Sequence, residues 1–495
     1  MAHIIGKGRI KELIPEYFIK ERELDREEEV DIELIDAKQL LVPERIDLIC
    51  KLYYIDCFEK GINLEFAKKL YTEHIRAFSN GTFTEPGTET KNTIEKYIKT
   101  FEELIRDIKE NGFDADKSVV PVGNNGAIID GSHRTAIAIY YNIPIPIVRL
   151  KNVNVSYNYR FFRKRNLGEE YLDFMAYNYV LWADNVYVAC LWPSVYNDER
   201  FSEAENLIKA CAKIIYKKSV ALNYNGLKQL MLHMYIKHDW IGNVKNGFSG
   251  IDGKAKPCYK EASQTTFFLL AGIELDKILE LKEKIRGIFK IENHSIHITD
   301  TKDEAIEAGR IVFNKNSIEL LNYGEPLKYK ALFENIINFK SDLSVNNCNP
   351  DEYIVGGDSV LALYGLRNSD KVEYFSDNSK CVVLEKSKEY TDIGNQLPLY
   401  PASLEEMLYK PADYAYYMNI KFVSLNLIKS MKEKKNNACD KNDLKLIKAF
   451  EKKTQDTSWG RKLKTHIITS GKKNAIIGFA LKVYGFLRCR MQSRS

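Results

Sequence analysis

The sequence predicts a multidomain protein of the α/β class (α+β in its overall organisation), on three observations. The chain has 495 residues, more than one hydrophobic core usually serves, so two to four domains are expected. Strand-like runs such as Val119–Val122 and Val186–Pro193 alternate with segments of helical periodicity such as Ile94–Ile108. Hydrophobic residues make up 45% of the chain and proline only 13 residues, which is typical of folded proteins with little disorder.

Changes in composition divide the chain into six segments. The first is too acidic at Glu21–Glu33 to be core, and the third is a run rich in tyrosine. The expected segments are a charged helical arm (1–54), a first α/β unit (55–150), a helical connector (151–185), a middle α/β unit (186–325), a third unit (326–456) and a basic amphipathic tail (457–495).

The most specific pattern of the first unit lies between residues 119 and 148. Val119–Val122 and Ala127–Ile129 have the character of short strands joined by an Asn-Asn-Gly turn, and His133–Tyr141 that of a helix. Ile143–Val148 is expected to return as a strand, and its two prolines, Pro144 and Pro146, indicate the edge of a sheet.

Four polar residues, Asp130, Ser132, His133 and Arg134, therefore gather at the N-terminus of the predicted helix. Free backbone N–H groups and the helix dipole favour an anion there. Arg134 can add a bidentate clamp on phosphate. The sequence predicts a phosphate site at this turn.

The run IIDGSHRTAIAIYYNIPIPIV resembles the core of the ParB/sulfiredoxin-like fold, in which a D-G-x-H-R turn follows a strand and opens a helix. The resemblance covers about a fifth of the chain, residues 63–150. Sulfiredoxins need a cysteine in the region where Ser132 stands. Chromosome-partition ParB proteins carry a more arginine-rich turn and a helix-turn-helix, of which there is no convincing example after Leu150, so we expect no DNA binding. The branch that phosphorylates small molecules, such as free serine, resembles this chain best.

That branch pairs the turn with an upstream glutamate acting as base, and the segment FTEPG offers Glu85. The alternative is a solvated loop glutamate before a Pro-Gly turn. The resemblance implies catalytic roles for Glu85, Asp130, His133 and Arg134, and phosphate binding by Gly131, Ser132 and Arg134. It also implies Mg²⁺ held by Asp130, with ATP, ADP or CTP as the donor.

The middle unit offers two polar clusters. Glycines from Gly242 to Gly253, followed by Lys254 and Lys256, suggest a phosphate cradle, although the P-loop spacing is absent and an irregular loop is the alternative. In HSIHITDT, His297 shares a strand face with its polar neighbours, and Asp300 ends the strand, where α/β sheets bind ligands. Structural polar residues are the alternative. Both patterns resemble large uncharacterised proteins associated with bacterial surface-polysaccharide genes.

The third unit resembles the nucleotidyltransferase fold. Tyr353–Arg367 is similar to the strand, turn and helix that open that fold, with Gly357 and Ser359 in the turn. Two-metal chemistry needs two carboxylates two residues apart on the next strand. Those positions hold Lys371 and Glu373, so we expect an impaired metal site; a shifted register would use Asp370 instead. Ile420–Val423 and Lys441–Leu444 resemble the closing helices of the fold.

The tail and the cysteines bear on location. Residues 457–495 contain nine Lys or Arg and no acid around an apolar aromatic segment, which suits an anionic membrane surface; a terminal helix packed on the body is the alternative. The nine scattered cysteines form no C-x-x-C pair and favour a reducing compartment without a zinc site. Without a signal peptide or a membrane span, we expect a cytoplasmic protein, with peripheral contact to the inner membrane through the tail.

Three functions remain open. The first is a nucleotide-dependent kinase that phosphorylates a small hydroxylated precursor of a bacterial surface polysaccharide, so that its partners are a nucleotide and a small molecule. The second is a nucleotide-binding scaffold or regulator without turnover. The third is transfer of a nucleotidyl or phosphoryl-alcohol group by the third unit.

Overall fold

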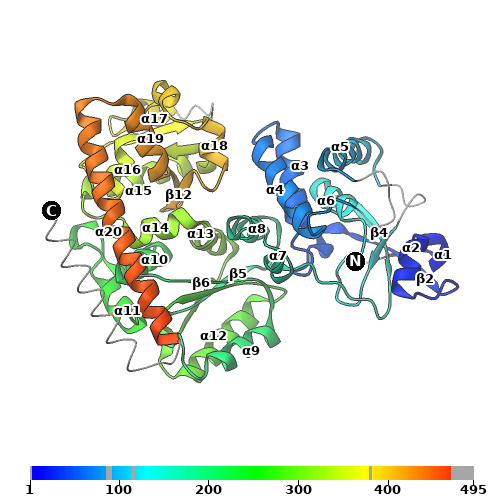
Figure 1. Cartoon of the computed structure of the whole chain (residues 1–495). Helices are drawn as coiled ribbons and strands as arrows, with labels where there is room; N and C mark the ends of the chain where they lie inside the picture. The colour runs from blue at the N-terminus through cyan, green and yellow to red at the C-terminus, as the bar shows by residue number, and fades with distance from the viewer. Residues whose placement is uncertain (1–2, 85–91, 114–118, 378–381, 470–495) are drawn as a thin grey trace.

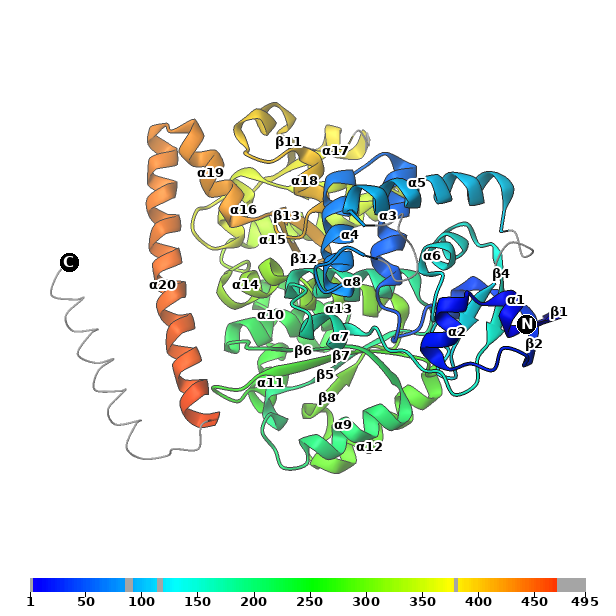
Figure 2. The ribbon, with the colours of Figure 1, turned by 45° about the vertical axis from the view of Figure 1, so that its right-hand side comes forward.

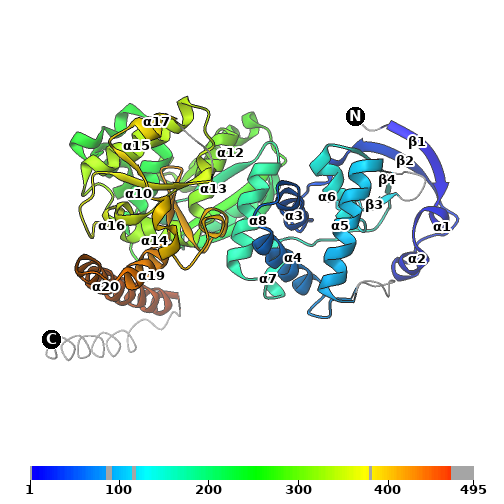
Figure 3. The ribbon, with the colours of Figure 1, turned by 90° about the horizontal axis from the view of Figure 1, so that it is seen from above.

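The structure, a computed structural model, describes residues 3–84, 92–113, 119–377 and 382–469. Three separate sheets are surrounded by helices, which confirms the mixed α/β character expected from the sequence (Figure 1). The first unit lies at one end of the molecule, and the middle and third units lie together at the other end (Figure 3).

The first unit is built on a four-stranded sheet in the order β1-β2-β4-β3. Neighbouring strands are antiparallel except for the parallel pair β3 and β4. Helices α3, α5 and α6 pack on the sheet and on one another. The elements are β1 (His3–Arg9), α1 (Ile10–Leu13), α2 (Glu16–Arg22), β2 (Glu29–Asp36), α3 (Leu48–Lys60), α4 (Leu64–Phe78), α5 (Ile94–Asn111), β3 (Val120–Val122), α6 (Ser132–Tyr141) and β4 (Pro144–Arg149).

The helical arm expected over residues 1–54 is wrong in its first part, because β1 and β2 are strands of this sheet. From Glu29 to Leu34 in β2, acidic residues alternate with apolar ones, and this period of two is typical of a strand. Val30 and Ile35 lie on opposite faces and are buried in different clusters of the core. The high charge of the segment concealed that period.

The sheet edge predicted for the prolines is also wrong. β4 lies inside the sheet, between β2 and β3. Pro144 and Pro146 are compatible with this place because the pairing with β3 involves only Ile147–Arg149, beyond both prolines. The strand expected at Ala127–Ile129 is reduced to a single bridge between Val122 and Ile128.

The middle unit has an entirely antiparallel sheet in the order β6-β7-β5-β8. Alternate residues of β5 and β7 face α9 and α12 on one side and α8, α10 and α13 on the other. The elements are α7 (Tyr159–Lys164), α8 (Glu169–Trp182), β5 (Tyr187–Leu191), α9 (Phe201–Cys211), β6 (Lys213–Val220), α10 (Tyr224–Tyr235), α11 (Gly250–Cys258), β7 (Thr265–Ala271), α12 (Leu275–Phe289), β8 (Ile296–Ile298), α13 (Lys302–Val312) and α14 (Lys315–Tyr323).

Helix α8, in the segment expected to be a connector, is a core helix. Ten consecutive residues, Tyr171–Val180, are buried. Phe174 packs edge-to-face against Tyr53 of α3 with 4.7 Å between ring centroids, and the hydroxyl of Tyr177 accepts a hydrogen bond from Arg310 of α13. A helix buried on all sides joins the first unit to the rest of the molecule through one continuous core.

The third unit has a five-stranded mixed sheet in the order β11-β10-β9-β13-β12. Ile420–Val423, expected in a closing helix, is strand β13, because four buried residues between β12 and β9 suit a strand better than a helix end. Helix α20 runs along the outside of the third and middle units (Figure 2). The elements are α15 (Lys330–Val345), β9 (Tyr353–Val355), α16 (Gly357–Leu363), β10 (Val372–Ser376), α17 (Val382–Lys386), β11 (Tyr390–Asp392), α18 (Leu404–Tyr409), β12 (Tyr414–Tyr417), β13 (Ile420–Val423), α19 (Leu425–Lys435) and α20 (Ala438–Thr469).

In the part of the chain that the structure describes, no helix has both the length and the apolar character needed to cross a membrane. The apolar, aromatic part of the predicted membrane-binding tail lies outside the described residues.

Candidate functional site

The DGSHR turn, where the sequence predicts a phosphate site, lies at the N-terminus of α6. Gly131 adopts φ 81°, a left-handed conformation that favours glycine, and starts the ten-residue helix. Glycine has no side chain that could cap the helix, and the N-terminus of a helix favours an anion.

Asp130 and Arg134 flank this turn. Arg134 Nη2 lies 3.6 Å from Asp130 Oδ2, and the two side chains are 23% and 36% exposed. A Cβ at Gly131 would lie only 2.8 Å from Arg134 Nη2, so the guanidinium folds over the glycine. Within the described residues this long ion pair is the one polar contact of Arg134, which leaves donors for a ligand.

A buried network of charged side chains contacts the strand end just before the DGSHR turn. Arg45 donates through Nη1 to the carbonyl of Ile128 at 2.6 Å and binds Asp47 with two hydrogen bonds of 2.8 Å. Lys51 Nζ lies 2.9 Å from Asp47 Oδ2 and 3.1 Å from His74 Nε2. All four side chains are at most 3% exposed.

The charges of this network set its protonation. Burial alone would raise the pKa of Asp47, but the charges of Arg45 and Lys51 hold that pKa well below its usual range. Burial, with the charge of Lys51, lowers the pKa of His74 well below its ordinary value. Asp47 is therefore ionised and His74 neutral at physiological pH.

His133 points into the helical layer of the first unit. Its Nε2 lies 2.7 Å from the hydroxyl of Tyr71, and its ring packs edge-on against Phe101 with centroids 4.7 Å apart. These contacts fix the first turn of α6 against α4 and α5. Through these contacts, His133 orients the DGSHR turn.

Glu85 lies outside the described residues, but the chain that leads to it can be followed to Thr84. At the end of α4, Phe78 packs on Tyr157 with 4.7 Å between ring centroids. The guanidinium of Arg45 stacks on that same tyrosine at 5.3 Å from its centroid. The segment before Glu85 thus starts next to the network that supports the DGSHR turn.

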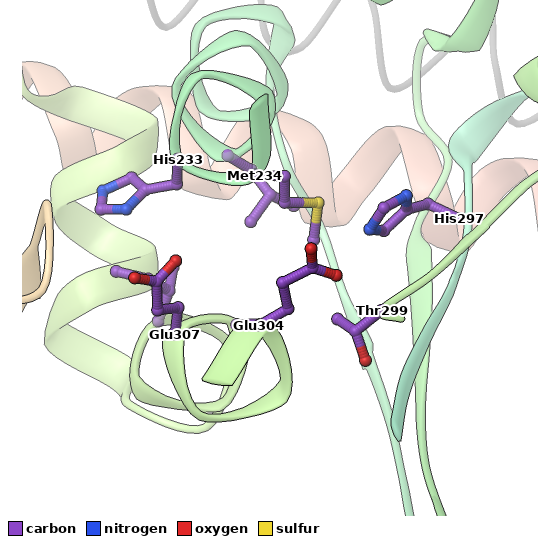
Figure 4. A pocket seen from close by; sticks show the side chains of 9 residues that line it. His233, Met234, His297, Thr299, Glu304 and Glu307 are labelled. Atoms are coloured by element: carbon purple, nitrogen blue, oxygen red, sulfur yellow. The ribbon is translucent and has the colours of Figure 1, made fainter. Parts of the chain in front are cut away.

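In the middle unit, His297 borders a small pocket of about 20 Å³, which is enough for a water molecule (Figure 4). His233 and Thr299 also line it, and Glu304 and Glu307 of α13 face it from below. Burial lowers the pKa of both histidines to about 3, helped at His297 by the charge of Lys282. Both imidazoles are neutral.

Asp300 does not join this pocket, because it pairs with Lys282 at 2.6 Å. The expectation that a ligand binds at the carboxyl end of this strand loses its basis, since that rule concerns parallel sheets and β8 is antiparallel to β5. The irregular loop predicted as an alternative for the glycine-rich segment is wrong at its end, because Lys254 and Lys256 lie on helix α11.

In the third unit three of the predicted residues, Gly357, Ser359 and Glu373, lie together at one turn. Gly357, with φ 56°, opens α16 beside Glu373 of β10, whose carboxylate accepts from Asp358 N at 2.5 Å. Ser359 Oγ donates to the carbonyl of Lys371 and accepts from Glu373 N, both at 2.8 Å. Burial and the nearby Asp358 carboxylate raise the pKa of Glu373.

Asp370 is exposed and precedes β10, whereas Glu373 lies on the strand and faces the turn. The structure does not bring the two carboxylates of the alternative register together. Lys371, at the other expected carboxylate position, is also exposed.

Next to this turn, a lysine occupies the centre of a group of carboxylates. Lys432 Nζ lies 2.6 Å from Asp358, 2.8 Å from Asp443 and 3.2 Å from Asp440, and its side chain is 4% exposed. Arg367 joins Asp358 and Asp443 at 3.2 and 2.7 Å. These carboxylates raise the pKa of Lys432 against the effect of burial, so it remains charged.

Within the described ranges there is no group of three or more His, Cys, Asp or Glu side chains arranged to hold a metal ion. Comparisons with protein-family models, with curated proteins and with solved structures gave no match for this chain. The geometry of the sites is therefore the basis for a function.

Sequence reasoning missed the buried charges, Arg45, Asp47 and Lys51 in the first unit and Lys432 in the third. The i, i+4 spacing of Asp47 and Lys51 was the one local signal, and it is equally typical of a surface helix. Burial comes from packing between distant segments, which the spacing of residues does not reveal.

Proposed function

We propose that this protein is a nucleotide-dependent phosphotransferase that phosphorylates a small hydroxylated compound, with the catalytic site at the N-terminus of α6. The observation that carries the proposal is the left-handed Gly131 that opens α6, with Arg134 folded over it and Asp130 beside it. The positive end of the dipole of α6 and an arginine with donors to spare suit the phosphates of a nucleotide.

Each residue of the turn has a role in this proposal. The N–H groups of Ser132 and its successors bind phosphate, and Arg134 stabilises the charge that develops on the transferred group. Glu85 accepts the proton of the substrate hydroxyl. His133, held by Tyr71, fixes the orientation of the helix.

Asp130 fits a magnesium ion as a single ligand. Mg²⁺ in nucleotide sites is commonly held by one or two carboxylates together with phosphate oxygens and water, so three protein ligands are not required. Asp130 is half-buried at the mouth of the turn and would hold the ion beside the phosphates. When bound, the ion neutralises phosphate charge.

The test is transfer of phosphate from ATP, ADP or CTP to a panel of small alcohols, followed by the appearance of a phosphorylated product. We expect turnover in the wild type. Glu85→Gln should lose turnover and keep nucleotide binding, whereas Arg134→Ala should lose both. Nucleotide binding with no transfer to any alcohol would favour the scaffold alternative.

A ligand-binding role without transfer is the second candidate for the third unit. It is favoured by the use of Glu373 to cap the turn at Gly357 and by Lys432 at the centre of the carboxylates. Surface-polysaccharide precursors as substrates, and membrane contact through the tail, stay proposals that come from the sequence.

A further inference from the structure

The two polar motifs of the middle unit meet on one side of its sheet. Tyr235, at the end of α10, packs on the ring of Trp240 with 5.3 Å between centroids. Its hydroxyl lies 3.2 Å from Nδ1 of His297 on β8. Trp240, His297 and the tyrosine between them therefore form one continuous surface, although the sequence places them in separate segments.

Helix α11 closes over this surface. A Cβ at Gly250 would lie 2.1 Å from the carbonyl oxygen of Trp240, so the start of α11 approaches that loop as only glycine allows. Lys254 donates to the carbonyl of Asn293, just before β8, and Cys258 Sγ lies 3.6 Å from His294 Nδ1. The helix brings a lysine to the start of β8.

Three cations lie near enough to His297 to affect its pKa. The charges of Lys282 and Arg286, both on α12, and of Lys254 on α11 add to burial in lowering its pKa. Lys282 is neutralised by Asp300 at 2.6 Å, and Arg286 Nη1 contacts the largely exposed Glu283 at 2.6 Å.

Lys254 pairs with no carboxylate among the described residues, and a backbone carbonyl is its hydrogen-bond partner. Burial and the charge of Arg286 lower its pKa.

Two buried N–H donors in the same region lack an acceptor within the described chain: Nε1 of Trp192 and Nε of Arg286. Trp192 is fully buried, and its ring centroid lies 6.4 Å from that of His297. Buried donors without partners are rare and costly in folded proteins. Two of them beside an unpaired lysine point to a missing acceptor that carries negative charge.

We propose that the region around Trp192, Tyr235, Lys254, Arg286 and His297 binds an anionic group, phosphate or carboxylate, carried by a ring compound. The buried donors and Lys254 would bind the anion. Trp240, which is 48% exposed and packs on Tyr235, would stack on the ring. This site is separate from the α6 turn and does not depend on the function proposed there.

The experiment is calorimetric titration of the full chain with glucose 1-phosphate, glucuronate and neutral glucose. All proteins carry Arg134→Ala, so that the α6 turn does not contribute. The two anions distinguish phosphate from carboxylate, and glucose measures the ring alone. Lys254→Gln removes the unpaired charge, and Lys256→Gln, at an exposed position of the same helix, is the matched control.

We expect saturable binding of one of the two anions and none of glucose. Lys254→Gln should weaken that binding by about tenfold or more, the usual effect of losing a charged hydrogen bond, while Lys256→Gln leaves it unchanged. Failure of both anions to bind, or equal affinities in the two lysine variants, would overturn the proposal.

A surface variant keeps the test decisive if Lys254→Gln does not fold. Trp240→Ala changes an exposed side chain and should weaken binding of the ring anion severalfold, with no loss of thermal stability. Unchanged affinity in this variant would contradict the stacking role of Trp240.

Discussion

Asp47 is a buried carboxylate between two cations, Arg45 and Lys51. Asp47→Asn leaves both cations without a counter-charge, and breaking such a buried pair costs about 3–5 kcal/mol. We expect a loss of that size in the free energy of unfolding, measured by denaturant titration. Glu103→Gln, in an exposed pair with Lys99, is the control and should change stability by about 0.5 kcal/mol or less. Equal losses would contradict the account of the network.

Two half-buried histidines, His233 and His297, predict how stability depends on pH. Their pKa is about 3 in the folded protein, against about 6.5 when unfolded. Between these values the unfolded state binds more protons, so stability should fall as the pH drops below about 6.5. At pH 5, each histidine should lower the free energy of unfolding by about 2 kcal/mol.

The measurement is the free energy of unfolding at a series of pH values. His297→Gln should remove its share of the pH dependence. An unchanged slope in that variant would show that His297 is protonated in the folded protein.

At the scale of single elements, Gly131 at the start of α6 makes a sharp prediction. Gly131→Ala places a side chain in left-handed backbone and pushes it against Arg134, so we expect lower thermal stability and loss of nucleotide binding. Gly61, at the end of α3, is also left-handed, with φ 65°, and has nothing within 4 Å of an added Cβ. Gly61→Ala should therefore lose some stability and keep nucleotide affinity.

Helix α19 contributes Lys432, whose ammonium group is the counter-charge shared by Asp358, Asp440 and Asp443. We expect millimolar Mn²⁺ to leave the Tm of the wild type unchanged. Lys432→Ala should lower the Tm, because three carboxylates lose their counter-charge, and Mn²⁺ should restore part of the loss.

Lys429→Ala, on the same helix, is the control, since Lys429 pairs with Glu451 near the surface. A wild-type Tm that rises with Mn²⁺ and no longer does so after Asp443→Asn would show that the carboxylates bind a metal in spite of the lysine.

The extent of sequence-based prediction differs between elements. The turn at Asp130, helix α6 and strand β4 follow from local signals, namely a Gly turn and apolar periodicity. Strand β2 and the interior place of β4 do not, because sheet order depends on pairing between segments distant in the chain. The sequence singled out Glu373 as a carboxylate position of the third unit, but its hydrogen bond from Asp358 N could be found only in the structure.

At the scale of the whole molecule, helix α8 predicts cooperative unfolding. Phe174 contacts Tyr53 of the first unit, and Tyr177 of the same helix contacts Arg310 of the middle unit. Phe174→Ala should cost about 3–5 kcal/mol and shift a single transition that circular dichroism and tryptophan fluorescence report together. Leu181→Ala, at a 39% exposed position of α8, is the control. A separate, earlier transition of the first unit would contradict a shared core.

The most direct test of the central claim is calorimetric titration of the wild type and of Arg134→Ala with ATP, ADP and CTP in the presence of Mg²⁺. Arg149→Ala, which changes an exposed arginine of the same unit, is the control. We predict that one nucleotide binds the wild type and the control alike, and that Arg134→Ala abolishes this binding. Binding that survives Arg134→Ala, or no binding of any nucleotide to the wild type, would contradict a nucleotide site at the N-terminus of α6.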